Sequence, residues 1–319
     1  TTDVYNVAVG YTAGQSVTTG FQNTLIGGFA GAALTDADYN IAIGYGALSS
    51  DTLGSRSVAI GRTALEAQNF TTATDAYNVA IGFAAGEVVT VGQLNTLVGS
   101  LAGNALTSGG DNVAIGYSAL SAEDGHGLNV AVGSQALRVQ NAGANAYNVG
   151  VGYNAGGAVT TGVQNTLIGG LAGDALTDAD YNTALGYLAL SADTLGSTST
   201  AVGAFTLRDQ NLTTATESHN TAVGYNAGGD VTTGTRNTIV GALAGDSLTT
   251  GAKNVAIGTG ALSEDDVGSR SVAVGDSALA AQNFATATDT YNTAVGNNAG
   301  LAVTTGVRNV LIGGLAGDA

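Results

Sequence analysis

A short pattern of polar and apolar residues recurs along the whole chain. It consists of Asn, three residues drawn from Val, Ile, Leu, Ala, Thr and Gly, then Gly, two variable residues and, in all units but one (Thr206), Ala. It begins at 18 positions, usually 17 residues apart, and we call its first residue the anchor. Fifteen anchors are Asn and three are Ser (Ser57, Ser199 and Ser271). Triplets such as "VAV" and "TLI" between Asn and Gly are typical of short strands, because Val, Ile and Thr favour the β conformation.

The units are also grouped in fours. Successive blocks of four units span 72, 70, 72 and 72 residues, and the fourth unit carries extra residues, such as 68–77, which we expect to form a loop. Helices are not expected, because Gly recurs too often and no apolar spacing of 3.6 residues persists. We expect a second, shorter strand about eleven residues after the anchor, at 17–20, 34–35, 106–107, 159–162, 176–177, 231–234, 248–249 and 303–306.

One unit of this size cannot bury a core alone, so each must stack on the next, with parallel strands about 4.8 Å apart. The sequence therefore predicts an all-β, repetitive parallel β-solenoid (β-roll) of about 18 coils over residues 1–319, without a domain boundary. Gly and Asn tolerate the positive φ angles of tight corners. Stacked Asn amides can also form hydrogen-bonded ladders. We expect the ladder and corner positions to include Asn6, Asn23, Asn40, Asn78, Asn95 and Asn112, with Gly10, Gly27, Gly44 and Gly61.

Neither face of the predicted strand carries a charged residue. Successive side chains of a strand point to opposite faces, so the first and third residues after the anchor oppose the second. One face can fill the coil, and we expect the other to meet a second copy of the chain. We assign interchain packing to the second position, with the Ala seven residues after the anchor keeping that contact close. The expected contact residues are Ala8, Leu25, Ala42, Leu97, Leu167, Ile239 and Leu311.

The charge balance excludes some partners. The 24 acidic and 8 basic residues give a net charge of −16, which cannot form a basic surface for nucleic acid. The apolar runs are too short for membrane insertion. We expect the acidic residues to lie in water, on the part of the coil away from the strand; they include Asp36, Asp38, Asp51, Asp174, Asp178, Asp180, Asp193 and Glu264 to Asp266.

The twelve tyrosines lie just before an anchor or just after the fixed Gly. They share the parity of the first and third strand positions, so we expect stacked aromatic rows at the two ends of that face. A sugar- or ligand-stacking stripe is the alternative.

Candidate chemistry is sparse. The phrase "GDSL" at 245–248 matches an esterase motif, but it aligns with "GDAL" at 173–176 of the repeat. A Ser nucleophile needs a base, and His126 and His219 are the only histidines. We interpret His219 as a packing variant of Tyr and place His126 in a turn. With no Cys and two His we expect no transition-metal site and no cofactor. Asp36, Asp38, Asp178 and Asp180 are calcium candidates, with a solvated acidic turn as the alternative.

The repeat resembles two known families. "SVAIG" at 57–61 and "SVAVG" at 271–275 resemble the head repeats of trimeric autotransporter adhesins. The phrasing of 220–245 is similar to shaft repeats of phage tail fibres. The resemblance covers nearly the whole chain and implies a left-handed β-roll, assembled as a homotrimer, in an extracellular attachment fibre. The adhesin repeat is shorter than 17 residues, which leaves the cross-section of the roll open.

These patterns lead us to expect a structural, non-enzymatic segment of a homotrimeric attachment fibre, located in a virion fibre or on a bacterial surface. We favour a phage fibre over an adhesin head, and we expect the chain to be a fragment of a longer fibre protein. A host receptor would then contact parts outside this chain. An ice-binding solenoid is an alternative, because flat Thr rows can order water. A polysaccharide-cleaving solenoid is another, but it needs clustered carboxylates in a groove.

Overall fold

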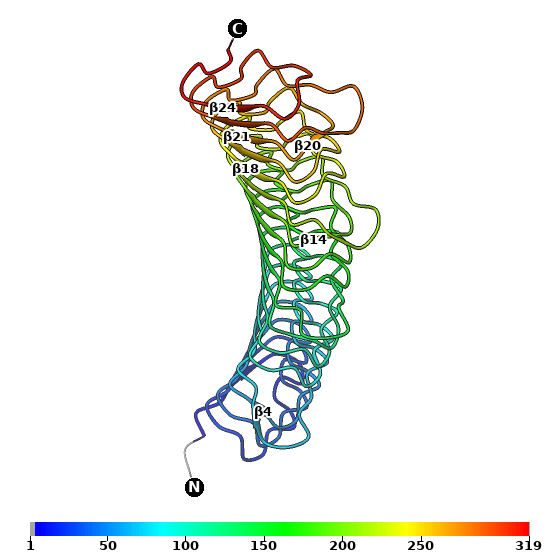
Figure 1. The fold of residues 1–319 in the computed structure, drawn as a ribbon. Coiled ribbons are helices and arrows are strands. Elements are labelled where there is room, and N and C mark those ends of the chain that lie inside the picture. Colours follow the sequence, from blue (N-terminus) through cyan, green and yellow to red (C-terminus); the bar gives the residue numbers. More distant parts are fainter. Residues whose placement is uncertain (1–3, 319) are drawn as a thin grey trace. The chain divides into compact units, whose positions relative to one another are not determined.

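A computed structural model describes residues 4–318, which form an all-β parallel solenoid of about 18 turns. The described residues contain no helix, as the recurrence of Gly predicted. They divide into two compact units, the first ending at Val163 and the second beginning at Gln164, and each unit is a stack of coils (Figure 1). The predicted fold class is confirmed for both units.

Among the described residues, the main sheet of unit 1 contains nine parallel strands, one for each turn, that pair in chain order. Each triplet between anchor and Gly forms one strand, and equivalent residues of neighbouring triplets are in register, as in Val7 with Thr24. The strands are β1 (Val7–Val9), β2 (Thr24–Ile26), β3 (Ile41–Ile43), β5 (Val58–Ile60), β7 (Val79–Ile81), β8 (Thr96–Val98), β9 (Val113–Ile115), β10 (Val130–Val132) and β11 (Val149–Val151).

Unit 2 repeats this arrangement with nine further strands in parallel register. They are β12 (Thr166–Ile168), β13 (Thr183–Leu185), β15 (Thr200–Val202), β17 (Thr221–Val223), β18 (Thr238–Val240), β19 (Val255–Ile257), β21 (Val272–Val274), β23 (Thr293–Val295) and β24 (Val310–Ile312).

The second strand lies elsewhere than predicted. Two-residue strands pair only where a longer fourth turn supplies extra residues: β4 (Gly54–Ser55) with β6 (Thr74–Asp75), β14 (Gly196–Ser197) with β16 (Thr216–Glu217), and β20 (Gly268–Ser269) with β22 (Thr288–Asp289). The prediction at 17–20 and its seven counterparts is wrong. There the chain bends, and the Thr18 and Gly20 amides both donate to the Thr35 carbonyl oxygen instead of forming a ladder.

Each corner after a strand requires Gly. Gly27 has a φ of +132°, and a Cβ there would lie 2.5 Å from the carbonyl oxygen of Gly44 in the next turn. The roles predicted for Gly10, Gly27, Gly44 and Gly61 are therefore confirmed. The anchor Asn does not adopt positive φ. The residue before it does, as at Tyr39 (φ 59°), whose amide donates to the Phe21 carbonyl oxygen of the preceding turn.

The anchor Asn residues instead form the predicted ladder, inside each unit. The Asn23 side chain donates to the Ala37 carbonyl oxygen at 2.7 Å, and its Oδ1 accepts the Asn40 amide at 2.9 Å. The same two bonds recur at Asn6, Asn40, Asn78, Asn95 and Asn112. Each side chain thus satisfies one buried carbonyl of its own turn and one amide of the next.

The second strand position faces the interior of its own coil, so its assignment to interchain packing is wrong. Leu25 is 1% exposed, and Ala42, Leu97, Leu167 and Ile239 are fully buried within the single chain. In the end strands Ala8 is exposed and Leu311 half-exposed. The Ala seven residues after the anchor is also interior, as Ala30, Ala47 and Ala64 show. Both faces of the strand are apolar, so alternation alone could not identify the inner one.

The interior is filled by matched volumes. Eight residues after the anchor the four units of a block carry Gly, Gly, Leu and Leu. A Cβ on Gly14 or Gly31 would lie 2.7 Å from a methyl group of Leu25, so Leu25 occupies the space that the two glycines leave. In the next two turns Leu48 and Leu65 fill the same column. The interior thus stays close-packed, although side-chain sizes alternate.

Candidate interaction surface

The outward side of the strands forms a continuous uncharged face in each unit. We call the first and third residues after each anchor the strand face; all are Val, Ile, Leu or Thr. In the middle of the units these side chains remain half-exposed, with Ile81, Ile115, Val223 and Ile257 each 37% exposed. A contiguous apolar surface of this kind is typical of interaction sites.

Tyrosine rows border the strand face, as predicted. All twelve rings are exposed, by 40–74%. They do not stack on one another directly, because Phe29 lies between Tyr11 and Tyr45 with edge-to-face centroid distances of 5.5 Å. Phe205 has the same place between Tyr187 and Tyr225. The rows therefore continue the apolar surface beyond the strands.

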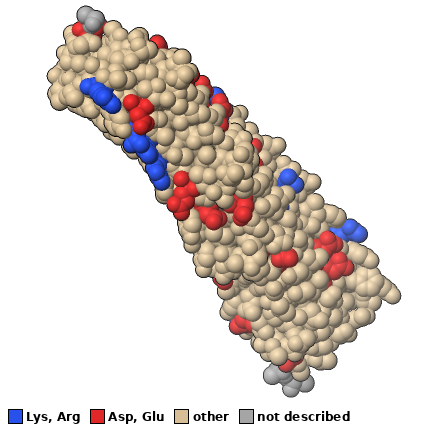
Figure 2. All heavy atoms as spheres, turned by 45° about the vertical axis from the view of Figure 1, so that its right-hand side comes forward, with Lys and Arg blue, Asp and Glu red and all other residues tan. Residues whose placement is uncertain are grey.

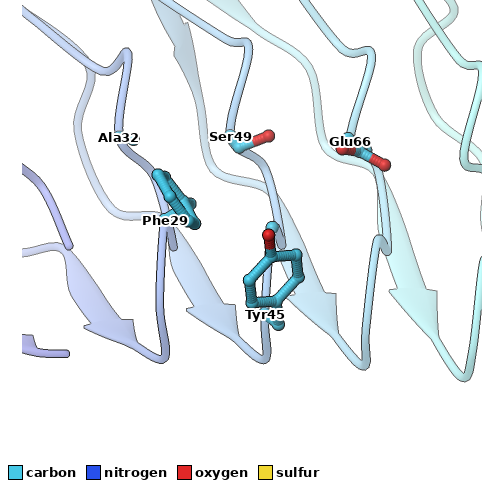
Figure 3. Close-up of a pocket in the computed structure, with 6 residues that line it drawn as sticks. Phe29, Ala32, Tyr45, Ser49 and Glu66 are labelled. Atoms are coloured by element: carbon cyan, nitrogen blue, oxygen red, sulfur yellow. The ribbon is translucent and has the colours of Figure 1, made fainter. Parts of the chain in front are cut away.

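A hollow of about 320 Å³ opens beside one aromatic row. It is lined by Phe29, Ala32, Tyr45, Gly46, Ser49 and Glu66, and Figure 3 shows Phe29, Tyr45 and Glu66 on successive turns. Tyr45 is 55% exposed, so the hollow is open. An aromatic ring with a nearby hydroxyl and carboxylate suits a sugar, but convergent polar groups that would fix one are few. The sugar-stacking interpretation stays a prediction.

The four calcium candidates do not form a cluster. Asp36 accepts a hydrogen bond from Thr19, and Asp38 accepts the Phe21 amide at 2.9 Å. Asp178 and Asp180 line an open hollow of about 300 Å³ with Glu217. Among residues 4–318, one set of three potential ligands comes together, and it consists of Glu123, Asp124 and His126. None of the four Asp residues belongs to it.

Several acidic residues expected in water are buried. Asp51 and Asp193 have no exposed surface, and neither does Asp265, one of the residues 264–266. The Asp193 carboxylate accepts hydrogen bonds from the Gly196 and Leu212 amides and from Gln210, which in turn accepts from Asn220. Burial raises the pKa of the Asp193 and Asp265 carboxyl groups, and hydrogen bonds oppose this rise. These carboxylates belong to the interior.

The sequence contained a signal for these buried acids. Eleven residues after the anchor the first block carries Val17, Leu34, Asp51 and Gln68, and the later blocks repeat apolar, apolar, acidic, Gln. Since Val and Leu at that position face inward, the acid and Gln must do so too. The hydrogen bonds that link the acid to Gln, and Gln to the next anchor Asn, offset the free-energy cost of burying these polar side chains.

Basic charge gathers in one column of unit 2. Arg236, Lys253, Arg270 and Arg308 each stand just before an anchor, and together they are half of the chain's eight basic residues. Arg270 pairs with Asp289 at 2.9 Å. Figure 2 shows one group of basic side chains close together and others apart from it, on a surface that is otherwise largely uncharged, with acidic groups scattered over it. The column borders the strand face, so positive charge lies next to the apolar surface.

In the part of the chain that the structure describes, we find no helix that could span a membrane. Comparison with known protein families, curated proteins and solved structures finds no match to this chain.

Proposed function

We propose that this chain is a structural segment of a homotrimeric extracellular attachment fibre. The observation that carries the proposal is the strand face, which is uncharged in every turn, carries Val, Ile or Leu at the third position after every anchor, and stays partly exposed in the single chain. Covering the strand face with further copies of the same chain removes apolar area from water. Each Å² of apolar area buried in this way stabilises the assembly by about 25 cal/mol. Interfaces of this kind, repeated turn after turn, give a stiff fibre that holds a binding tip away from a surface.

Charge supports association of like chains. The basic column of unit 2 borders the strand face. A second copy of the chain brings acidic residues, of which it has 24, to the contact with this column. Oppositely charged groups beside an apolar contact fix its register more than they strengthen it. Repulsion between chains of charge −16 is reduced because no charged residue lies on the strand face itself.

Charged substitutions on the strand face test this proposal. Ile115→Lys in β9 together with Val223→Lys in β17 places ammonium groups where both side chains already reach water, so each single chain should still fold. We expect the assembly to dissociate to monomers in sedimentation velocity. Thr233→Lys, on an exposed bend away from the strands, is the matched control and should keep the wild-type mass. Unchanged assembly of the double variant would overturn the proposal.

The origin of the fibre follows from the full gene. A phage tail fibre is the origin that we favour, and a self-cleaving chaperone domain downstream would support it. A coiled coil and a membrane anchor would favour the alternative, a trimeric autotransporter adhesin. In both cases we propose an extracellular location and receptor contacts made by other parts of the fibre. No catalytic role is proposed.

An ice-binding solenoid is a second candidate, and one observation favours it. Five consecutive strands of unit 2 carry an outward Thr in direct register, at Thr166, Thr183, Thr200, Thr221 and Thr238. The row is interrupted elsewhere, because β19 and β21 begin with Val. Thermal hysteresis in a solution of the chain, lost in Thr200→Val with Thr221→Val, would support ice binding. Its absence from the wild-type chain would reject it.

A further inference from the structure

The second block departs from the others at its buried acid. In the other three blocks the acid is Asp, followed three residues later by Gly, as in Asp193 and Gly196. The Gly amide donates to the Asp carboxylate at 3.1 Å. A Cβ on Gly196 would lie 2.1 Å from Asp193 Oδ2, so no larger residue fits there beside Asp. In the second block both positions change together, to Glu123 and His126.

This exchange leaves two polar atoms without a hydrogen bond. Glu123 is fully buried, and its Oε2 accepts from Gln140 at 3.2 Å, as the Asp residues do from their Gln. Its Oε1 has no hydrogen-bond donor. The buried His126 Nδ1 likewise lacks a hydrogen bond and lies 3.6 Å from that oxygen. Orphaned buried polar atoms are rare and costly, so two that face each other indicate a missing partner.

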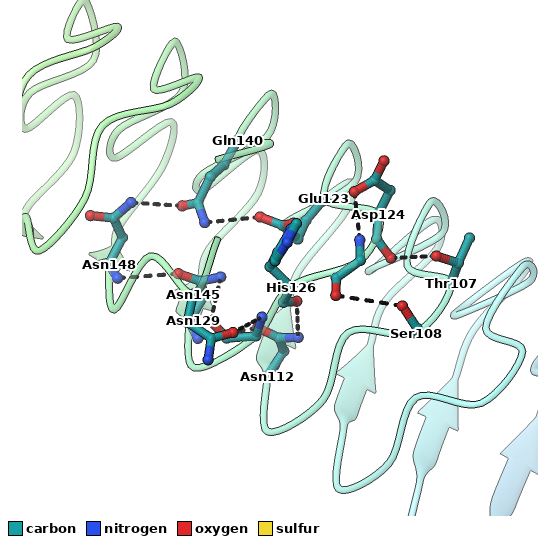
Figure 4. Close-up of polar contacts among 12 residues, drawn as sticks. Thr107, Ser108, Asn112, Glu123, Asp124, His126, Asn129, Gln140, Asn145 and Asn148 are labelled. Atoms are coloured by element: carbon teal, nitrogen blue, oxygen red, sulfur yellow. Dashed lines mark hydrogen bonds and ion pairs between the residues drawn. The ribbon is translucent and has the colours of Figure 1, made fainter. Parts of the chain in front are cut away.

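Asp124 completes a group of three. Figure 4 shows Glu123, Asp124 and His126 beside one another at the bend of this turn. One ligand atom from each lies within 4.8 Å of the other two. Ligands held about 2.0–2.1 Å from a zinc ion lie closer together than this, so an ion would draw the group inward. Asp124 can follow, because its side chain is exposed and, among residues 4–318, its carboxylate accepts only the neighbouring Gly125 amide.

We propose that Glu123 Oε1, His126 Nδ1 and an Asp124 carboxylate oxygen bind a divalent first-row transition metal ion such as Zn²⁺. One imidazole with two carboxylates suits zinc, cobalt or nickel, whereas calcium and magnesium prefer oxygen ligands alone. Gln140 is a positioning residue that holds the Glu123 carboxylate through its other oxygen. The ion would bridge the buried interior to the exposed bend in one turn of unit 1, and would stabilise that turn on binding.

Calorimetric titration of the full chain with Zn²⁺ tests the site. We expect one ion for each chain, with at least tenfold weaker binding of Mg²⁺. Asp124→Asn keeps the fold because its side chain is exposed, and should weaken Zn²⁺ binding at least tenfold. Glu123→Asp with His126→Gly restores the pattern of the other blocks and should abolish binding.

His219→Ala is the matched control, since it removes the other histidine, which pairs with the exposed Glu217 at 3.2 Å. This variant should bind Zn²⁺ as the wild type does. No zinc binding by the wild-type chain would overturn the proposal and leave Glu123 and His126 as a buried ion pair. Binding that survives Glu123→Asp with His126→Gly, or that His219→Ala removes, would overturn it as well.

Discussion

At the residue scale, the place of a polar side chain in the turn decides what it does. Asn40 is fully buried, yet both ends of its amide bond the backbone, to Gly54 at 2.9 Å and Ser57 at 2.9 Å. Asp193 is buried too, and its carboxylate is satisfied by two amides and Gln210. A three-residue strand leaves the buried backbone amides and carbonyls of the rest of the turn without ladder partners. Polar side chains in the interior form hydrogen bonds with these backbone groups.

Asn40→Ala should destabilise the chain by about 2–4 kcal/mol, because it leaves a buried carbonyl and a buried amide without partners. Chemical denaturation gives the free energy of unfolding. Asn297→Ala, at an exposed position, should change it by less than about 0.5 kcal/mol. Equal effects of the two substitutions would show that the ladder does not stabilise the fold.

Stability should depend on pH through the buried carboxylates. Burial raises the folded-state pKa of Asp193 and Asp265 above the ordinary value of 3.8. The folded chain therefore holds these protons more tightly than the unfolded chain. The stability they contribute is fully present below pH 3.8 and is lost as the pH rises through the folded-state pKa.

The double variant Asp193→Asn with Asp265→Asn lacks both carboxyl groups and should lose that decline. Its free energy of unfolding, measured from pH 3.5 upward, should therefore fall less steeply than that of the wild type. Asp276→Asn, at an exposed site, controls for the loss of charge. Identical pH profiles for the double variant and the wild type would contradict the raised pKa values.

At the element scale, one turn is shaped by its corner and by the volumes stacked inside it. The corner Gly lies directly against the backbone of the next turn, whereas its neighbour does not. Leu25 occupies the space above Gly14 and Gly31, so the Gly and Leu columns are complementary. A change of size in one column must therefore be matched in the other.

Gly27→Ala and Gly28→Ala provide a matched pair at one corner. A Cβ on Gly27 would meet the Gly44 carbonyl oxygen at 2.5 Å and face a positive φ, so we expect a loss of at least about 3 kcal/mol. A Cβ on Gly28 meets only the Tyr45 ring, at 3.5 Å, and should cost less than about 1 kcal/mol. Thermal denaturation should separate the two variants, and similar melting temperatures would contradict the close approach of turns.

The spacing of Asn and Gly was enough to predict every strand of the main sheets. It was not enough to tell the inner strand face from the outer one. Alternation shows only that Val7 and Ala8 point to opposite faces, and because both residues are apolar, either face could be the inner one. The signal was volume, since Leu25 is large where Gly14 and Gly31 are small. The prediction that Asp51 lies in water was wrong, because acidic side chains are usually exposed. Asp51 is buried against Gln68 of the next turn, which donates a hydrogen bond to its carboxylate, and this contact exists only between stacked turns.

At the scale of the whole molecule, the strand face and the tyrosine rows leave apolar surface uncovered in both units. The charged residues that give the net charge of −16 all lie off the strand face, so this uncharged face is the surface through which we propose that the chains associate. Because apolar burial is not screened by salt, we expect the assembly to persist at 1 M sodium chloride. Dissociation at that concentration would instead indicate an interface held by ion pairs.

Sedimentation equilibrium of the full chain tests the proposed trimer most directly. We expect a single species with three times the 31.0 kDa mass of one chain, unchanged across a hundredfold range of protein concentration. A species of 31.0 kDa that stays constant over the same range would contradict a strand face covered by sister chains.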